Sequence, residues 1–280
     1  MDDLVSTRWL AEQLSRPGLV VVDATAHVLD PTGDARVEFA SGHIPGARFL
    51  DLASLSDAAS EVPAALPTGE QFAARMAELG IGNDDLIVLY DDTPARTSAR
   101  AWFACRLHGA RAAILDGGLG KWRTEGRPLE SGMPAVAASS FGAHRGEGAV
   151  RTKSKVLASI GGAIEQLVDA RGAGRFLGTE PEPRPNMASG HIPGSLNLPF
   201  GRVLKPNGTF RDAVGIRAAF AEAGVDLDKP VVTTCGSGVT AAVLLFALHL
   251  IGKDDVALYD GSWSEWGADP ATPKVTGAIA

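Results

Sequence analysis

The sequence predicts an α/β protein made of two tandem domains, each with a mainly parallel sheet flanked by helices. Short runs of β-branched residues alternate with segments of helical periodicity along the chain. A set of motifs in the first half also recurs, in the same order, in the second half. A segment rich in Gly, Ala and Ser separates the two copies. We therefore expect a first domain at residues 1–130, a linker at 131–150 and a second domain at 151–280.

Four pairs of motifs define the duplication. They are VVVDA at 20–24 with QLVDA at 166–170, ASGHIPGA at 40–47 with ASGHIPGS at 188–195, LIVLYDD at 86–92 with PVVTTCG at 230–236, and LDGGLGKW at 115–122 with YDGSWSEW at 259–266. Four landmarks in one order are hard to obtain by chance, so the chain is interpreted as a duplicated domain of about half its length.

The expected elements alternate between helix and strand in both copies. In the first copy the pattern predicts a helix at 6–15, a strand at 19–23, a helix at 69–79, a strand at 85–90, a helix at 95–108 and a strand at 112–115. In the second copy the same elements are expected near 153–160, 165–169, 212–224, 230–234, 240–251 and 255–259. Short apolar strands between helices are typical of a buried parallel sheet. Ligands of such sheets bind beyond the carboxyl ends of the strands.

Composition and charge narrow the function classes. The 280 residues are 45% hydrophobic and 21% charged, with a net charge of −7. This argues against nucleic acid or an anionic membrane as the main partner, because both require a basic face. The apolar stretch Ala241–Ile251 is too short to span a bilayer, and the N-terminus lacks the pattern of a signal peptide. Two cysteines give no disulfide framework, so we expect a cytoplasmic protein.

No cofactor or metal is expected. The sequence contains neither GxGxxG nor GxxxxGK, which would indicate a dinucleotide or phosphate site. His27, His108, His144 and His249 do not have the spacing of a metal-binding set.

The segment TTCGSGVTAA at 233–242 is the strongest candidate site. Cys235 follows a predicted strand, and Gly236, Ser237 and Gly238 lead to a helix that starts near Thr240. Glycines allow successive backbone N–H groups to turn inward and form an anion-binding nest, to which the helix N-terminus adds positive charge. We expect a thiol held there to be a thiolate at neutral pH, and the same loop suits a persulfide anion.

The first copy provides an internal control. At the position of Cys235 it has Asp91, which indicates that only the second copy carries the nucleophile. The other cysteine, Cys105, lies on an apolar helix face and is interpreted as a buried structural residue. A phosphatase loop is excluded because Ala241 stands where that chemistry requires an arginine. Trp122 and Trp266, which match across the repeat, are interpreted as packing residues.

The tandem halves, the paired GHIPG segments, Asp91 in place of cysteine and the CGSGVT loop resemble the rhodanese superfamily, and within it the mercaptopyruvate sulfurtransferases. The resemblance covers nearly the whole chain. It implies two rhodanese-like α/β domains, an active site in the cleft between them and a cysteine persulfide intermediate on Cys235. The loop residues Gly236, Gly238, Val239 and Thr240 would then bind the transferred sulfur.

The sulfur donor is inferred from the charge of the loop and from two arginines. Thiosulfate sulfurtransferases typically have basic side chains directly after the cysteine, whereas this chain has neutral Gly236 and Ser237. Arg175 and Arg184 match arginines that, in the resembled family, bind the carboxylate and keto oxygen of 3-mercaptopyruvate. In the alternative interpretation both arginines pair with Glu180 and Glu182 on a solvated loop.

The resemblance also implies a proton relay beside the cysteine. Ser237 matches the loop serine, His43 of the first HIPG segment matches the histidine, and Asp34 is the expected acidic partner. The alternative for His43 is a structural histidine that bonds its own turn, as is expected for His191 in the second copy.

The expected function is transfer of sulfur from 3-mercaptopyruvate through a Cys235 persulfide to a thiol, such as a thioredoxin-type protein, or to cyanide, with release of pyruvate. Two alternatives remain open. One is a thiosulfate:cyanide sulfurtransferase of the same fold. The other is a non-catalytic sulfur carrier or regulatory module, which would accept sulfur without turnover.

Overall fold

The computed structural model describes residues 2–28, 32–144, 146, 148–162 and 164–278. The chain forms two compact units, and each is described by itself. The first consists of Met1–Asp57, Leu66–Gly146 and Pro206–Phe210, and the second of Ala58–Ala65, Glu147–Lys205 and Arg211–Ala280. The expected linker includes residues 145 and 147, which lie outside the described residues. Its described part up to Gly146 belongs to the first unit, where Ser139 N–H donates to the carbonyl of Ala77.

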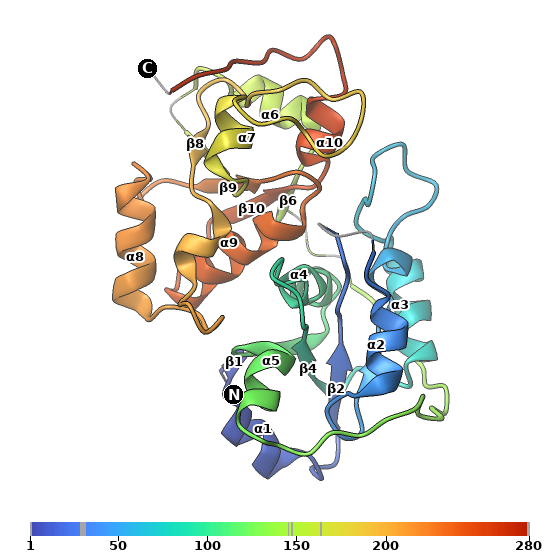
Figure 1. Cartoon of the computed structure of the whole chain (residues 1–280). Helices are drawn as coiled ribbons and strands as arrows, with labels where there is room; N and C mark the ends of the chain where they lie inside the picture. The colour runs from blue at the N-terminus through green and yellow to red at the C-terminus, as the bar shows by residue number, and fades with distance from the viewer. Residues whose placement is uncertain (1, 29–31, 145, 147, 163, 279–280) are drawn as a thin grey trace. The chain divides into compact units, whose positions relative to one another are not determined.

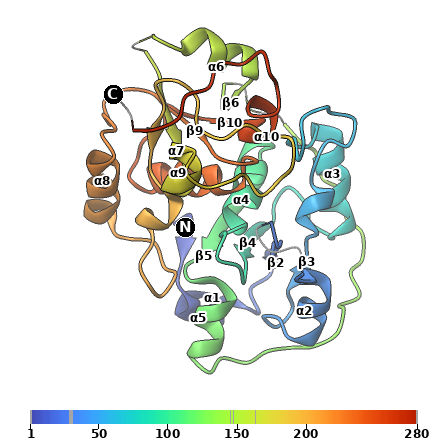
Figure 2. The same cartoon turned by 45° about the horizontal axis from the view of Figure 1, so that its top comes forward.

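The first unit is built around a sheet of five parallel strands in the order β1-β5-β4-β2-β3 (Figures 1 and 2). Its elements are β1 (Leu4–Val5), α1 (Thr7–Gln13), β2 (Leu19–Asp23), α2 (Ala35–Ser41), β3 (Arg48–Phe49), η1 (Leu52–Ser54), α3 (Gly69–Glu78), β4 (Leu86–Tyr90), α4 (Ser98–Leu107), β5 (Arg111–Leu115) and α5 (Gly118–Thr124). Every predicted helix and strand of this half is present, within three residues at each end.

The second unit repeats this architecture. Its five parallel strands have the order β6-β10-β9-β7-β8, which is the order of the first sheet, strand for strand. Its elements are β6 (Val150–Arg151), α6 (Lys153–Ser159), β7 (Gln166–Asp169), α7 (Ala173–Leu177), β8 (Leu196–Asn197), η2 (Phe200–Val203), α8 (Ala213–Glu222), β9 (Val231–Thr234), α9 (Val239–Leu250), β10 (Val256–Tyr259) and α10 (Ser262–Trp266). The predicted α/β fold with two flanked parallel sheets is confirmed.

Both faces of the sheets are buried. In the first unit, Val21 and Val88 of the sheet share one core cluster with Leu10 of α1, Phe39 of α2 and Trp122 of α5. The alternate strand residues point to the other face, where α4 contacts β4 and β5. In the second unit α9 contacts β9 and β10, is buried from Val239 to Leu248 and carries almost no polar residues.

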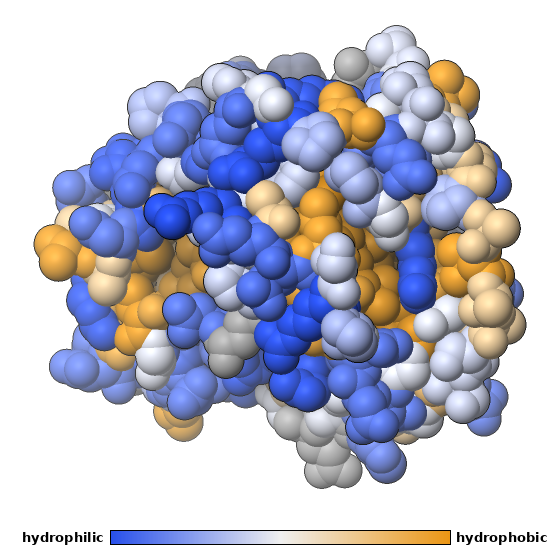
Figure 3. Space-filling view, turned by 90° about the horizontal axis from the view of Figure 1, so that it is seen from below, coloured by the Kyte–Doolittle hydropathy of each residue, from blue (hydrophilic) through white to orange (hydrophobic). Residues whose placement is uncertain are grey.

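Polar and hydrophobic residues are both exposed on the surface. The face shown in Figure 3 is largely hydrophilic, with hydrophobic residues exposed between the polar ones. Among the described residues, no helix is long and apolar enough to cross a membrane.

Candidate active site

Cys235 lies directly after β9, at the carboxyl edge of the second sheet, where ligands of parallel sheets bind. Its side chain is buried, with 2% of the residue exposed. The loop continues to Gly238, which caps α9 with a φ of 77°, a left-handed conformation that favours glycine. The helix starts at Val239, one residue before the predicted start. Ser237, Val239 and Thr240 are buried around the same turn.

The backbone N–H groups of this loop are available to a ligand. Among the described residues, none accepts a hydrogen bond from the backbone N–H groups of residues 236–240. They include the first N–H groups of α9, which by their position have no partner inside the helix. A buried row of unpaired N–H groups at a helix N-terminus attracts an anion.

The start of α10 fixes the backbone of the loop. Trp263 N–H donates to the carbonyl of Cys235 at 2.9 Å, and Ser264 N–H donates to the carbonyl of Gly236 at 2.8 Å. The Ser262 hydroxyl accepts from Cys235 N–H at 3.2 Å and donates to the carbonyl of Tyr259 at 2.9 Å. Cys235 is therefore held by its own backbone, and its side chain takes no part in the bracing. These residues were not predicted from the sequence, although Ser262 and Ser264 replace Gly118 and Gly120 of the first copy.

Both predicted arginines lie at this loop. Arg184 donates to the Ser264 hydroxyl, which in turn donates to the carbonyl of Gly236 at 2.6 Å. Arg175 lies against Gly236 itself, since a Cβ added there would be 3.1 Å from Arg175 Nη2. The structure thus brings Arg175, Arg184 and the Cys235 loop together within one unit.

A buried charge network positions Arg175. The Glu182 side chain, 1% exposed, accepts from Arg175 Nη2 at 2.5 Å and from Arg171 Nη1 at 2.6 Å. Arg171 also pairs with the buried Asp169, and its guanidinium lies over the Trp263 ring. The pairing of Arg175 with Glu182 is the contact of the alternative interpretation. However, Glu182 is buried rather than solvated, and Arg184 has no carboxylate partner among the described residues.

In the equivalent loop of the first unit, a carboxylate of the loop itself accepts the hydrogen bonds of the neighbouring backbone N–H groups. Asp91 is buried and accepts hydrogen bonds from Thr93 N–H at 3.2 Å, Ser98 N–H at 3.0 Å and the Ser98 hydroxyl at 2.5 Å. Burial raises the pKa of Asp91, while Ser98 and then Arg96 act in the opposite direction. Leu119 N–H donates to the carbonyl of Asp91, which repeats the bond between Trp263 and Cys235. The two loops therefore share this backbone hydrogen bond and differ in the side chain at its acceptor residue, which is a carboxylate in the first unit and a thiol in the second.

The structure does not form the expected contact between Asp34 and His43. Asp34 caps α2 instead, accepting from the N–H groups of Arg36 and Val37. His43 uses Nδ1 to bond the carbonyl of Phe39 at 2.8 Å and stacks on the Phe39 ring, and its buried Nε2 has no partner among the described residues.

His191 makes the same pair of contacts in the second unit. Its Nδ1 bonds the carbonyl of Phe176 at 2.8 Å, and its ring stacks on Phe176. Both HIPG histidines therefore secure their own turns, which is the alternative interpretation of His43.

The remaining interpretations of single residues agree with the structure. Cys105 is buried in α4, and burial raises the pKa of its thiol to about 12, so it is an inert thiol. Trp122 and Trp266 are completely buried, and each donates from Nε1 to a proline carbonyl, that of Pro128 or Pro273.

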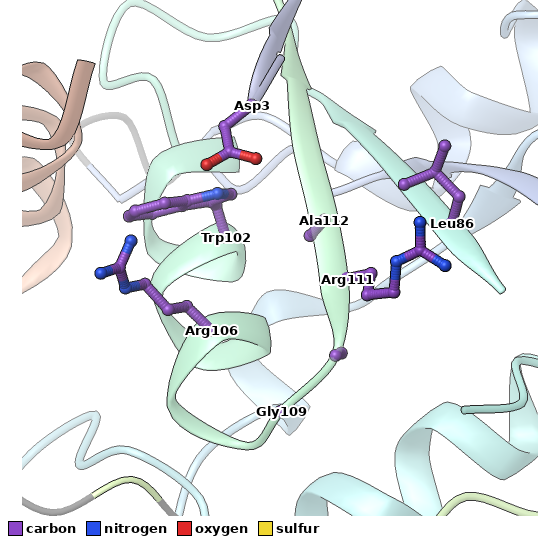
Figure 4. Close-up of a pocket in the computed structure, with 8 residues that line it drawn as sticks. Asp3, Leu86, Trp102, Arg106, Gly109, Arg111 and Ala112 are labelled. Carbon is purple, nitrogen blue, oxygen red and sulfur yellow. The ribbon is translucent and has the colours of Figure 1, made fainter. Parts of the chain in front are cut away.

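A cavity of about 280 Å³ opens at the opposite, amino edge of the first sheet, where β4 and β5 begin. The Trp102 ring lies between the Asp3 carboxylate and the Arg106 guanidinium (Figure 4). Ligand sites of parallel sheets lie at the carboxyl edge, so we do not assign the activity to this cavity.

The chain is similar in sequence and in structure to known sulfurtransferases. The model of the rhodanese-like domain matches residues 6–125 and 152–269. A human 3-mercaptopyruvate sulfurtransferase is 41% identical, over 94% of this chain and 91% of the relative. A thiosulfate sulfurtransferase from Bos taurus is also 41% identical, with the same coverage. The crystal structure of an Escherichia coli 3-mercaptopyruvate sulfotransferase is 37% identical, with a TM-score of 0.86 over 95% of this chain and all of that one.

Proposed function

This chain belongs to the family of rhodanese-like domain proteins, and we propose that it transfers sulfur from 3-mercaptopyruvate through a persulfide on Cys235. The single observation that carries the proposal is the loop after β9. It holds the buried Cys235 at the start of a run of backbone N–H groups for which the described residues supply no acceptor. Such a loop stabilises the negative charge of a persulfide formed on Cys235.

The choice of donor is supported by the loop and by its arginines. Relatives named for either donor are equally similar to this chain, so identity does not separate 3-mercaptopyruvate from thiosulfate. Gly236 and Ser237 bring no charge to the loop, which suits a donor with one carboxylate better than a doubly charged one. Arg184 is free of carboxylate partners among the described residues, and Arg175 lies against Gly236. A planar guanidinium matches the carboxylate of 3-mercaptopyruvate.

The proposed reaction has two steps. The Cys235 thiolate attacks the donor sulfur, the bond between sulfur and carbon breaks, and its electron pair leaves on the carbon as the pyruvate enolate, which takes up a proton. An acceptor thiolate or cyanide then attacks the outer sulfur of the persulfide and releases the Cys235 thiolate. Arg175 and Arg184 orient the carboxylate and keto oxygen, and the N–H groups of residues 236–240 stabilise the charge on sulfur.

Ser237 is the proposed route for the proton, because its buried hydroxyl belongs to the same loop. The mechanism does not use His43 or Asp34, since His43 bonds its own turn and Asp34 caps a helix.

A thioredoxin-type thiol and cyanide are the proposed acceptors, and the cytoplasm is the proposed location. The first domain, at residues 1–130, would carry no nucleophile, and the second, at 151–280, would carry the reaction. The net charge of −7 supports a small-molecule donor rather than nucleic acid.

The test compares both donors on one preparation. Pyruvate release from 3-mercaptopyruvate with a reducing thiol is measured beside thiocyanate formation from thiosulfate and cyanide. We expect a higher kcat/KM for 3-mercaptopyruvate, and we expect Cys235→Ser to abolish turnover and the added sulfur detected by mass spectrometry. Cys105→Ala is the matched control, because it removes the other cysteine, whose thiol is buried and inert.

Two outcomes would contradict the proposal. Preference for thiosulfate would overturn the choice of donor while leaving Cys235 as the nucleophile. Sulfur loading of Cys235 without sustained turnover with either donor would identify a sulfur carrier.

A further inference from the structure

The first unit, which lacks the cysteine, has a cavity of its own. Its volume is about 560 Å³, within the range of small-molecule sites. It lies at the carboxyl ends of β4 and β5, the edge that carries Cys235 in the second unit. The lining comes from the loop after β4, from the start and end of α5, and from the distant Asn207; it consists of Asp92, Thr93, Pro94, Arg96, Gly117, Gly120, Lys121, Thr124, Glu125 and Asn207.

Two buried polar atoms of this lining lack hydrogen-bond partners among the described residues. Thr93 is 4% exposed, and its buried Oγ1 has no hydrogen-bond partner. Arg96 has a buried Nε that is also without a hydrogen-bond partner, while its Nη1 forms an ion pair with Asp91 Oδ1 at 3.7 Å. A buried polar atom without a partner is costly, so these two groups indicate a missing ligand.

The acidic groups of the lining are already paired with cations. Asp92 accepts from Arg123, and Glu125 accepts from Lys121 and Arg127. Lys121 further donates to the Thr7 hydroxyl. The hydrogen-bonding capacity that these contacts leave is the Thr93 hydroxyl and the part of the Arg96 guanidinium that does not face Asp91, which together suit an anion.

Arg96 is held in place for such a ligand. Its φ of 53° is unusual for a residue other than glycine, and strained residues of this kind cluster at ligand sites. The guanidinium fills the space beside Gly208, where an added Cβ would lie 1.9 Å from Arg96 Nη2. Phe210 N–H, two residues on, is bonded to Asp116 at 2.8 Å, which anchors this segment on the first unit. A guanidinium fixed in this way loses little freedom when it binds.

We propose that the cavity of the first unit binds a small carboxylate, with Arg96 pairing with the carboxylate oxygens and the Thr93 hydroxyl donating to the ligand. This is a binding site without chemistry, because Asp91 stands where the second copy has its nucleophile. The site is independent of the proposed function and holds for any carboxylate that fits the cavity.

The test follows the Nε–Hε resonance of Arg96 by NMR in the intact, ¹⁵N-labelled protein, assigned by its loss in Arg96→Gln. The probe is sodium pyruvate, with sodium sulfite in a parallel titration. We expect a saturable shift with pyruvate and a roughly tenfold weaker Kd in Thr93→Val, because one hydrogen bond to a charged group is lost. The resonance is read in the wild-type protein, so the test does not depend on the folding of a variant.

Two controls separate this site from other binding. Arg16→Gln removes an exposed arginine of the same unit and should leave the Kd within about twofold. Arg184→Gln weakens pyruvate binding at the proposed catalytic residues and should also leave the Arg96 titration unchanged. The proposal is overturned if the Arg96 signal does not saturate, or if Arg184→Gln abolishes its shift. It is equally overturned if sulfite moves the signal and pyruvate does not.

Discussion

Arg175 and Arg184 are proposed to bind the same donor, yet the structure predicts that their removal has different consequences. Arg184 is exposed and bonds only the Ser264 hydroxyl among the described residues, so Arg184→Gln leaves no buried charge behind. Arg175→Gln removes one of two cations from the Glu182 side chain, which is 1% exposed. Arg184→Gln should therefore change donor binding alone, whereas Arg175→Gln should also lower the free energy of unfolding.

The expected magnitudes follow from these contacts. Loss of a hydrogen bond to a charged group costs about 1.5–3 kcal/mol, and exposure places Arg184 at the lower end, so kcat/KM for 3-mercaptopyruvate should fall roughly tenfold. Breaking a buried ion pair costs about 3–5 kcal/mol. Arg171 still neutralises Glu182, and the Arg175 side chain is 20% exposed, so solvent screens part of the loss. We expect Arg175→Gln to lower the unfolding free energy by about 1–2 kcal/mol.

Steady-state pyruvate release and urea unfolding measure the two effects on the same preparations. Arg202→Gln is the control, because its ion pair with Glu222 is exposed on both sides and should be worth less than about 0.5 kcal/mol. Equal destabilisation by Arg175→Gln and Arg184→Gln would refute the reasoning. So would an Arg184→Gln enzyme that keeps full activity with 3-mercaptopyruvate.

Three further predictions concern the loop, a buried carboxyl and the HIPG turn. Gly236→Arg should displace Arg175, whose Nη2 lies 3.1 Å from the position of a Cβ at residue 236. The ratio of thiosulfate activity to 3-mercaptopyruvate activity should therefore rise. An unchanged ratio would contradict the role of the neutral loop. Burial raises the pKa of Asp23 from 3.8 to about 6. Between these two pH values the folded protein therefore binds more protons than the unfolded chain, and the free energy of unfolding falls by about 3 kcal/mol as the pH rises from the lower value to the higher. Asp23→Asn should flatten this slope in urea unfolding measured from pH 4 to 7, and a retained slope would assign it to other groups. His43→Ala should lower the unfolding free energy by about 1–3 kcal/mol, because the hydrogen bond to the Phe39 carbonyl and the stacking on the Phe39 ring are lost. It should leave kcat within about twofold. A large fall in kcat in a folded variant would instead support the proton relay through His43.

The longer elements were predictable because their patterns are local. β2 was expected at 19–23 and forms at Leu19–Asp23, since a run of valines on a buried strand needs no tertiary information. The two-residue strands β1, β3, β6 and β8 were missed, because they are defined only by pairing with a neighbouring strand. The short helices α2, α5, α7 and α10 were also missed, since their five to seven residues are too few to establish a clear helical periodicity.

In the site, too, the features with a local sequence pattern were predictable, and those that depend on tertiary contacts were not. Cys235 and its loop are contiguous in the sequence, and their glycines indicate an unusual backbone. Glu182 and Ser264 act on the loop from other segments, so only the fold shows their contacts. The repeat did contain a signal for Ser264, which stands where the first copy has Gly120. The pairing of Asp34 with His43 was inferred from resemblance rather than from contact, and it is this inference that the geometry does not support.

The two loops that follow β4 and β9 give a physical basis for the proposal that only the second copy reacts. Each is held by a backbone N–H of the helix that follows the neighbouring strand: Leu119 of α5 donates to the carbonyl of Asp91, and Trp263 of α10 donates to the carbonyl of Cys235. In the first loop the Asp91 carboxylate accepts hydrogen bonds from the N–H groups of Thr93 and Ser98. The chain itself therefore supplies the anion to which these N–H groups donate. In the second loop the N–H groups find no acceptor among the described residues, and the side chain at the same position is a thiol. In the proposed reaction the negative charge is that of the persulfide sulfur, and the N–H groups of this loop stabilise it.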